Sequence, residues 1–115
     1  MDKFKKRELF LFNKAINTAR EFAGITTEAP SNYQIVYRLA CLQWEFAQEY
    51  RSESSSYYVS KASYTAAQKR IDTLEAGITE GAYKAQAVQA AADAREYLSL
   101  IAEYRIRNNK KCRVF

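Results

Sequence analysis

The sequence predicts an all-α protein organised around one long antiparallel helical hairpin. The chain has only one proline and three glycines in 115 residues, too few for the turns of a β-sandwich or barrel. Long tracts are dominated by alanine, glutamate, lysine and glutamine, which favour helix. This length fits a single domain, 1–115, and a hydrophobic content of 48% supports a modest core.

The first predicted helix covers about residues 3–23. Its apolar residues recur at spacings of three and four and form one stripe: Leu9, Phe12, Ile16, Ala19 and Phe22. Gly24 ends the helix, and a loop closed by Pro30 follows.

The second predicted helix covers about residues 32–76, because no proline or glycine occurs between Ser31 and Gly77. Ser31 followed by Gln34 fits a capping box at its start. One heptad register contains Val36, Gln43, Tyr50, Tyr57, Tyr64 and Ile71. The other register contains Leu39, Phe46, Glu53, Ser60, Ala67 and Leu74. The serines of residues 52–56 have weak helix propensity, which leaves a break at that point open.

The third predicted helix covers about residues 79–108 and follows a tight corner. Gly77 is expected to stop the preceding helix with a positive φ, and Thr79 to cap the next one. The seam of this helix contains Tyr83, Ala87, Ala90, Ala94, Tyr97, Ile101 and Tyr104. Two long helices joined by a short turn lie antiparallel, so Tyr64 is expected opposite Ala90. The first helix is too short to cover this hairpin, and we therefore expect a homo-oligomer.

The same antiparallel register places Cys41 near Cys112. The default interpretation is two reduced thiols in an intracellular protein, since two cysteines do not form a disulfide framework. The alternative is a reversible disulfide. The chain contains no apolar stretch long enough to span a membrane, and a secretory signal is not expected at its start.

Catalytic chemistry is not expected from this composition. The chain has no histidine, which removes the commonest general base and transition-metal ligand. No phosphate-binding glycine motif is present. Glu45 and Glu49 lie four residues apart, a spacing that on a helix is typical of a solvated surface. We therefore expect no enzyme, no catalytic residue, no metal site and no cofactor.

The positive charge is concentrated at the two ends of the sequence. Residues 1–14 contain five Lys/Arg and two Asp/Glu, residues 105–115 contain five Lys/Arg and no acid, and the other 90 residues contain eight basic and eleven acidic side chains. An antiparallel fold brings these ends together, and such a cluster suits a nucleic-acid backbone. The candidate residues are Lys3, Lys5, Lys6, Arg7, Arg105, Arg107, Lys110, Lys111 and Arg113. Phe4, Tyr104 and Phe115 are candidates for stacking on single-stranded bases. The alternative is a pair of solvated termini that aid solubility.

One region of the sequence resembles a known family. A long helix ends at Gly77, Thr79 and Glu80 open an alanine-rich return helix, and Glu103 and Tyr104 come late in it. Over about residues 44–107 this pattern is similar to small helical phage proteins, in particular the UvsY-type recombination mediators. The resemblance implies an oligomeric helical protein that binds single-stranded DNA and helps to load a recombinase.

Two functions therefore follow from the sequence. The first is a phage-type accessory protein that self-associates and binds nucleic acid, with single-stranded DNA favoured, through its basic ends. The second is a structural or adaptor protein, such as a virion component or a host-protein inhibitor, that acts through protein–protein contacts.

Overall fold

The computed structural model describes residues 3–50, 58–59, 61–108 and 113–114. Its helices are α1 (Lys3–Glu21), α2 (Ser31–Tyr50), α3 (Lys61–Ala76) and α4 (Lys84–Asn108). Two short strands, β1 (Tyr58–Val59) and β2 (Arg113–Val114), pair in parallel. Because each strand has only two residues, the predicted all-α class is confirmed.

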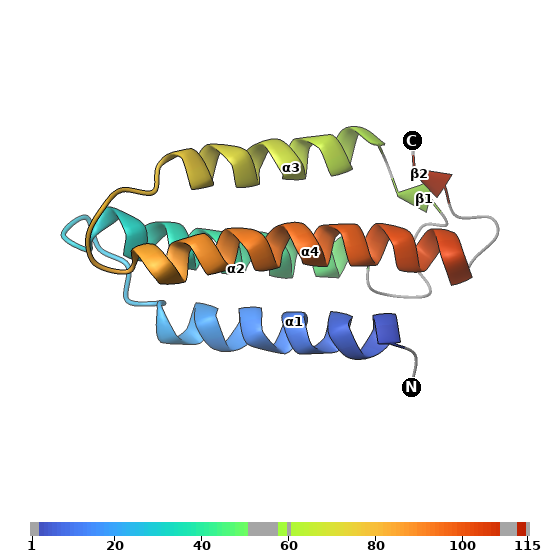
Figure 1. The fold of residues 1–115 in the computed structure, drawn as a ribbon, viewed down its shortest axis with the longest axis horizontal. Coiled ribbons are helices and arrows are strands. Elements are labelled where there is room, and N and C mark those ends of the chain that lie inside the picture. Colours follow the sequence, from blue (N-terminus) through green and yellow to red (C-terminus); the bar gives the residue numbers. More distant parts are fainter. Residues whose placement is uncertain (1–2, 51–57, 60, 109–112, 115) are drawn as a thin grey trace.

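The helices run alternately up and down the molecule (Figure 1). Consequently α2 and α4 are parallel to each other, and they form the closely packed centre. Helix α1 packs against both of them on one side, and α3 packs against both on the other. The start of α1 and the end of α4 lie at the same end of the bundle.

The prediction of one continuous helix over residues 32–76 is wrong. Helix α2 ends at Tyr50, and α3 begins at Lys61 and runs in the opposite direction. Residues 51–57 and 60 between them lie outside the described residues, so the expected seam positions there are not placed. The serine-rich stretch opposes helix formation only weakly, but a reversal of the chain lets both halves bury their apolar faces.

The seam that was expected to bind other chains is buried within this one. Val36, Leu39 and Ile71 are at most 1% exposed, and they pack with the alanines of α4. A second buried cluster, nearer the end of the bundle where α4 ends, contains Leu11, Phe46, Ala47, Tyr97, Leu98, Ile101 and Ala102. A single chain therefore has its own core, and the prediction of self-association no longer rests on an uncovered hairpin.

Helix α1 buries a different stripe from the predicted one. Leu11 and Ala15 are buried, whereas Leu9, Phe12 and Ile16 are only half-buried. Phe22, one residue beyond the end of α1, is the member of the predicted stripe that is buried. The helix is rotated because it lies across both α2 and α4, so that the centre of its contact face falls on Leu11 and the predicted residues flank it.

The corner between α3 and α4 is longer than predicted. Helix α4 begins at Lys84 rather than Thr79, and the backbone has positive φ at Gly81 (127°) and Tyr83 (65°) instead of at Gly77. The first helical hydrogen bond of α4 runs from Ala87 N to Tyr83 O, at 2.9 Å. The longer corner shifts the register between the helices, and Tyr64 packs against the cluster that contains Tyr97 instead of facing Ala90.

Candidate nucleic-acid interface

The two basic segments meet at one end of the bundle. Lys3, Lys5, Lys6 and Arg7 occupy the first two turns of α1, and Arg105 and Arg107 belong to the last turns of α4. These turns lie at the same end of the molecule (Figure 1), close to β2, which contains Arg113. Lys110, Lys111 and Phe115 lie outside the described residues. So do the side chains of Phe4, Tyr104, Arg105, Arg107 and Arg113.

The basic side chains of α1 differ in their surroundings. Lys3 and Lys6 are exposed to solvent. Lys5 is half-buried, with its Nζ 3.8 Å from Glu8 Oε2. Lys3 and Lys6 are therefore the α1 cations best placed to meet an external phosphate.

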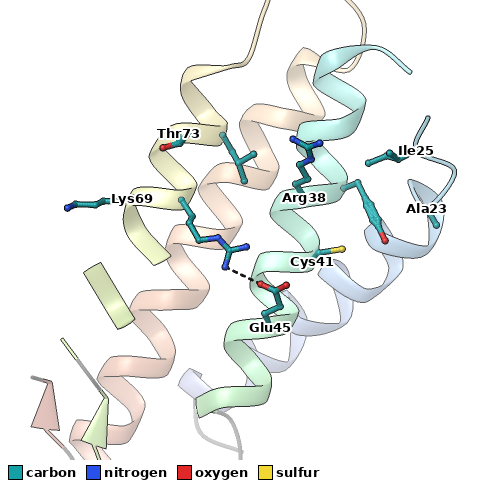
Figure 2. Close-up of a pocket in the computed structure, with 10 residues that line it drawn as sticks. Ala23, Ile25, Arg38, Cys41, Glu45, Lys69 and Thr73 are labelled. Atoms are coloured by element: carbon teal, nitrogen blue, oxygen red, sulfur yellow. Dashed lines mark hydrogen bonds and ion pairs between the residues drawn. The ribbon is translucent and has the colours of Figure 1, made fainter. Parts of the chain in front are cut away.

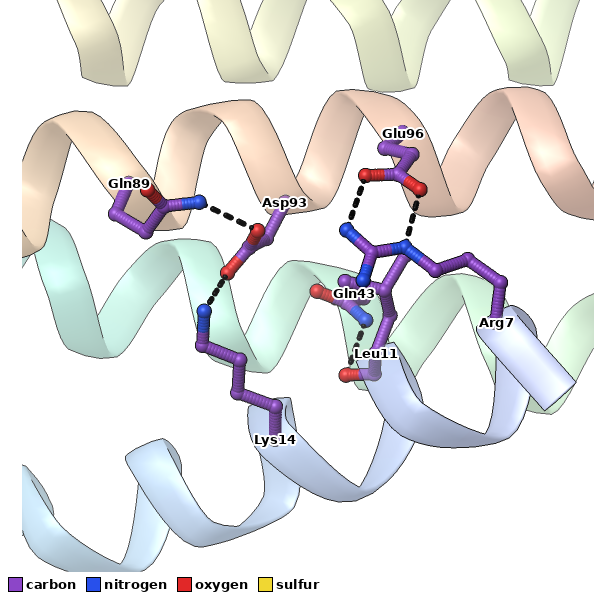
Figure 3. A network of polar contacts seen from close by, with 7 residues as sticks. All are labelled: Arg7, Leu11, Lys14, Gln43, Gln89, Asp93 and Glu96. Carbon is purple, nitrogen blue, oxygen red and sulfur yellow. Dashed lines mark hydrogen bonds and ion pairs between the residues drawn. The ribbon is translucent and has the colours of Figure 1, made fainter.

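Arg7 is held by an acidic residue on α4. Its Nε and Nη2 donate to the two carboxylate oxygens of Glu96, at 2.5 and 2.7 Å (Figure 3). The guanidinium carbon also lies 5.2 Å from the centre of the Phe10 ring. Such a paired arrangement fixes both partners, so Arg7 docks α1 on α4 and is less available to a ligand than Lys3 or Lys6.

Nothing in the sequence indicates Glu96 as a partner of Arg7, since the two are 89 residues apart. Phe10 was also missed as a candidate for base stacking. It lies off the predicted apolar stripe, and its ring is 54% exposed. A large aromatic residue next to a basic turn is a usable signal for this role, because bases stack on such rings regardless of sequence.

A second group of polar contacts lies between α1 and the centre of the bundle. Lys14 Nζ is 2.7 Å from Asp93 Oδ2, and Gln89 Nε2 donates to Asp93 Oδ1 at 2.8 Å (Figure 3). Gln43 Nε2, which is buried, donates to Leu11 O at 2.8 Å. These partners fix how α1 lies across α2 and α4, because a misplaced α1 would leave buried polar groups unsatisfied. We therefore assign these contacts a structural role.

The bidentate contact with Arg7 lowers the pKa of Glu96 below its ordinary value of 4.5, and the same contact raises the pKa of Arg7. A carboxyl group whose pKa is lowered by folding stabilises the folded state above its ordinary pKa. That contribution is lost as the pH falls through the lowered pKa.

We therefore expect Glu96→Gln to be destabilising at neutral pH but not in acid. Both side chains are at least 40% exposed, so the loss is at most about 1 kcal/mol at neutral pH. The measurement is urea unfolding of both proteins across the acid range. Glu21→Gln is the control, because Glu21 is an exposed acid at the end of α1, the helix that carries Arg7. A difference between wild type and Glu96→Gln that persists undiminished in acid would contradict the role assigned to this pair.

In the described part of the chain, no group of three or more Cys, Asp or Glu side chains is arranged to hold a metal ion. None of the helices in that part combines the length and apolar character needed to cross a membrane. No family model, curated protein or solved structure matches the chain. The resemblance to UvsY-type mediators therefore stays a prediction.

Proposed function

We propose that this chain is a non-enzymatic accessory protein that binds nucleic acid, with single-stranded DNA favoured, through its basic end. We define the basic end as the first turns of α1, the last turns of α4 and β2. The observation that supports this proposal most is that two basic segments far apart in the sequence meet at one end of the bundle.

The contrast in charge between this end and the other residues supports a localised interface. Outside residues 1–14 and 105–115, acidic side chains outnumber basic ones by eleven to eight. A phosphate backbone is attracted to a local excess of positive charge, from which bound counterions are released into solution. We infer that a strand contacts Lys3 and Lys6 on α1 and the basic residues that follow α4, and stacks a base on Phe10.

The first test is a titration of a fluorescent single strand of about 20 nucleotides at several salt concentrations. If about five phosphates are neutralised, log Kd should rise with log salt with a slope of about 3.5. Affinity that barely changes with salt, or no binding at micromolar protein, would overturn the proposal. Double-stranded DNA and RNA of the same length show whether single-stranded DNA is preferred.

Matched variants test where the strand binds. Lys3→Ser with Lys6→Ser should lower the slope by about 1.4, because two phosphate contacts are lost. Phe10→Leu should lower affinity by about fivefold or more through the loss of stacking, with little change in slope. Arg20→Ser is the control, because Arg20 is an exposed cation in the last turn of α1. An equal effect of Arg20→Ser would place the strand elsewhere.

A finer version of the proposal is that the protein self-associates and assists a recombinase on single-stranded DNA. It is supported by the resemblance described above. Mass measurement in solution, with and without a short single strand, tests the self-association. A single-chain mass under both conditions would exclude self-association at the concentration used.

An adaptor function is the second candidate, and the exposed Trp44 favours it. Its side chain is 41% exposed on α2, and tryptophan is enriched where protein interfaces concentrate their binding energy. A variant in which serine replaces Lys110, Lys111 and Arg113 distinguishes the two candidate functions. Unchanged function in that variant favours the adaptor, whereas lost function with an intact fold favours nucleic acid.

A further inference from the structure

A pocket of about 750 Å³ lies between α2 and α3, and none of the described residues that line it belongs to the basic end. The segment that follows α1 forms another wall, through Ala23 and Ile25 (Figure 2). The volume falls within the range of about 300–1,000 Å³ that is usual for small-molecule sites. The pocket is not part of the nucleic-acid interface proposed above.

The lining of this pocket combines apolar surface with positive charge. Ile25, Leu74 and the ring of Tyr37 supply apolar surface, and Arg38, Lys69 and Arg70 supply the charge. Among the described residues of the lining, the acidic side chain is that of Glu45, whose Oε2 is 3.1 Å from Arg70 Nη1 and pairs with it (Figure 2).

Among the described residues, two of these three cations have no partner of opposite charge. Within the described residues neither Arg38 nor Lys69 forms an ion pair, although both are exposed at the pocket. By contrast, Arg95 contacts Asp72 and Glu75 and is neutralised by these acids of a neighbouring helix. The pocket therefore has an excess of positive charge beside an apolar surface.

We propose that this pocket binds a small amphipathic organic anion. Its apolar body lies against Ile25, Leu74 and Tyr37, and its carboxylate or phosphate group meets Arg38. The Lys69 side chain points away from Arg38 (Figure 2) and adds only to the positive charge around the pocket. The length of the pocket favours a small molecule over a macromolecule. Its lining extends along α2 only from Tyr37 to Glu45, about 12 Å at the rise of an α-helix, which is short for a docked helix or strand.

Two amphiphiles of opposite charge test this proposal by calorimetry. Dodecanoate and dodecyltrimethylammonium have the same apolar chain, and both are used below the concentrations at which they form micelles. We expect one dodecanoate per protein, and about tenfold weaker binding of the cation, because it meets like charge at Arg38 and in the surrounding positive field. Equal binding of the two amphiphiles, or no binding of dodecanoate, would overturn the proposal.

Variants locate the bound anion. Arg38→Gln with Lys69→Gln should weaken dodecanoate binding about fivefold, as expected for the loss of one solvent-exposed ionic contact at Arg38 and of the further positive charge on Lys69. Both positions are exposed, so the fold should persist. Lys6→Gln, an exposed cation at the basic end, is the control and should leave binding unchanged. Unchanged binding in the double variant would show that the anion binds elsewhere.

Cys41 provides a direct probe of the pocket, because it belongs to the lining and is partly exposed. In a Cys112→Ser protein, dodecanoate should slow the reaction of Cys41 with iodoacetamide, which is uncharged. Protection of Cys41 by an oligonucleotide or an acidic peptide, without protection by dodecanoate, would overturn the proposal in favour of a macromolecular partner.

Discussion

Tyr97→Ala is expected to lower the free energy of unfolding by about 3–5 kcal/mol, the range measured for large aromatic side chains truncated in cores. Tyr97 is 0% exposed and lies in the cluster formed by α1, α2 and α4. Its neighbours there include Leu11 and Phe46, so the alanine would leave a cavity between three helices. Urea unfolding monitored by circular dichroism measures the loss.

Tyr97→Phe measures the contribution of the hydroxyl group separately from that of the ring. The hydroxyl donates to Glu8 Oε1 at 3.3 Å, and its removal should cost about 1–3 kcal/mol, because the buried Glu8 carboxylate loses a donor. Val88→Ala is the control on the same helix, because Val88 is 48% exposed and little is buried by its side chain. A cost for Tyr97→Ala as small as that for Val88→Ala would contradict the central position assigned to this ring.

The class of the fold and the bounds of α1 could be predicted because they depend on local properties. Helix-favouring residues at regular spacing, with few glycines and prolines, leave little choice but helix. The heptad pattern also identified true core positions, since Val36, Leu39 and Phe46 are buried in the structure. The periodic spacing of apolar residues identifies side chains that are buried in the folded protein. It does not show whether another helix of the same chain or a second chain covers them.

The break between α2 and α3 could not be predicted, because its cause is not local. The heptad pattern continues through Tyr50, Tyr57 and Tyr64, so periodicity favours a continuous helix. The propensity penalty of each serine is only about 0.5 kcal/mol. Burial of two apolar faces against the rest of the chain outweighs such small terms, but its size depends on a fold that the sequence does not display.

The candidate site also combines features that can be predicted from the sequence with features that depend on how the helices pack. The positive charge of both ends is visible in the sequence, but the engagement of Arg7 by Glu96 depends on how α1 lies on α4. The pocket beside Arg38 and Lys69 exists because α2 and α3 are separate helices. With a single helix over residues 32–76, Arg38 and Lys69 would lie tens of ångströms apart, at about 1.5 Å per residue.

Asn32→Ala is expected to cost about 2–4 kcal/mol, because one buried side chain holds the corner between α3 and α4. Asn32 is 2% exposed at the start of α2. Its Nδ2 donates to Thr79 O at 2.7 Å and to Ala82 O at 3.1 Å, while its Oδ1 accepts from Thr79 N at 2.9 Å. Alanine removes all three bonds and leaves the corner without these partners, since residues around Gly81 are outside any helical ladder.

Asn17→Ala is the matched control, because Asn17 is an exposed asparagine within α1 and alanine favours helix there. It should leave stability unchanged or raise it slightly. Amide exchange gives a second readout specific to the corner. The Thr79 amide should exchange faster in Asn32→Ala, whereas amides in the middle of α1 should be affected only through the overall loss of stability. Similar costs for the two alanines, with an unchanged Thr79 amide, would mean that the corner is held by its own backbone and that Asn32 is incidental to the hairpin.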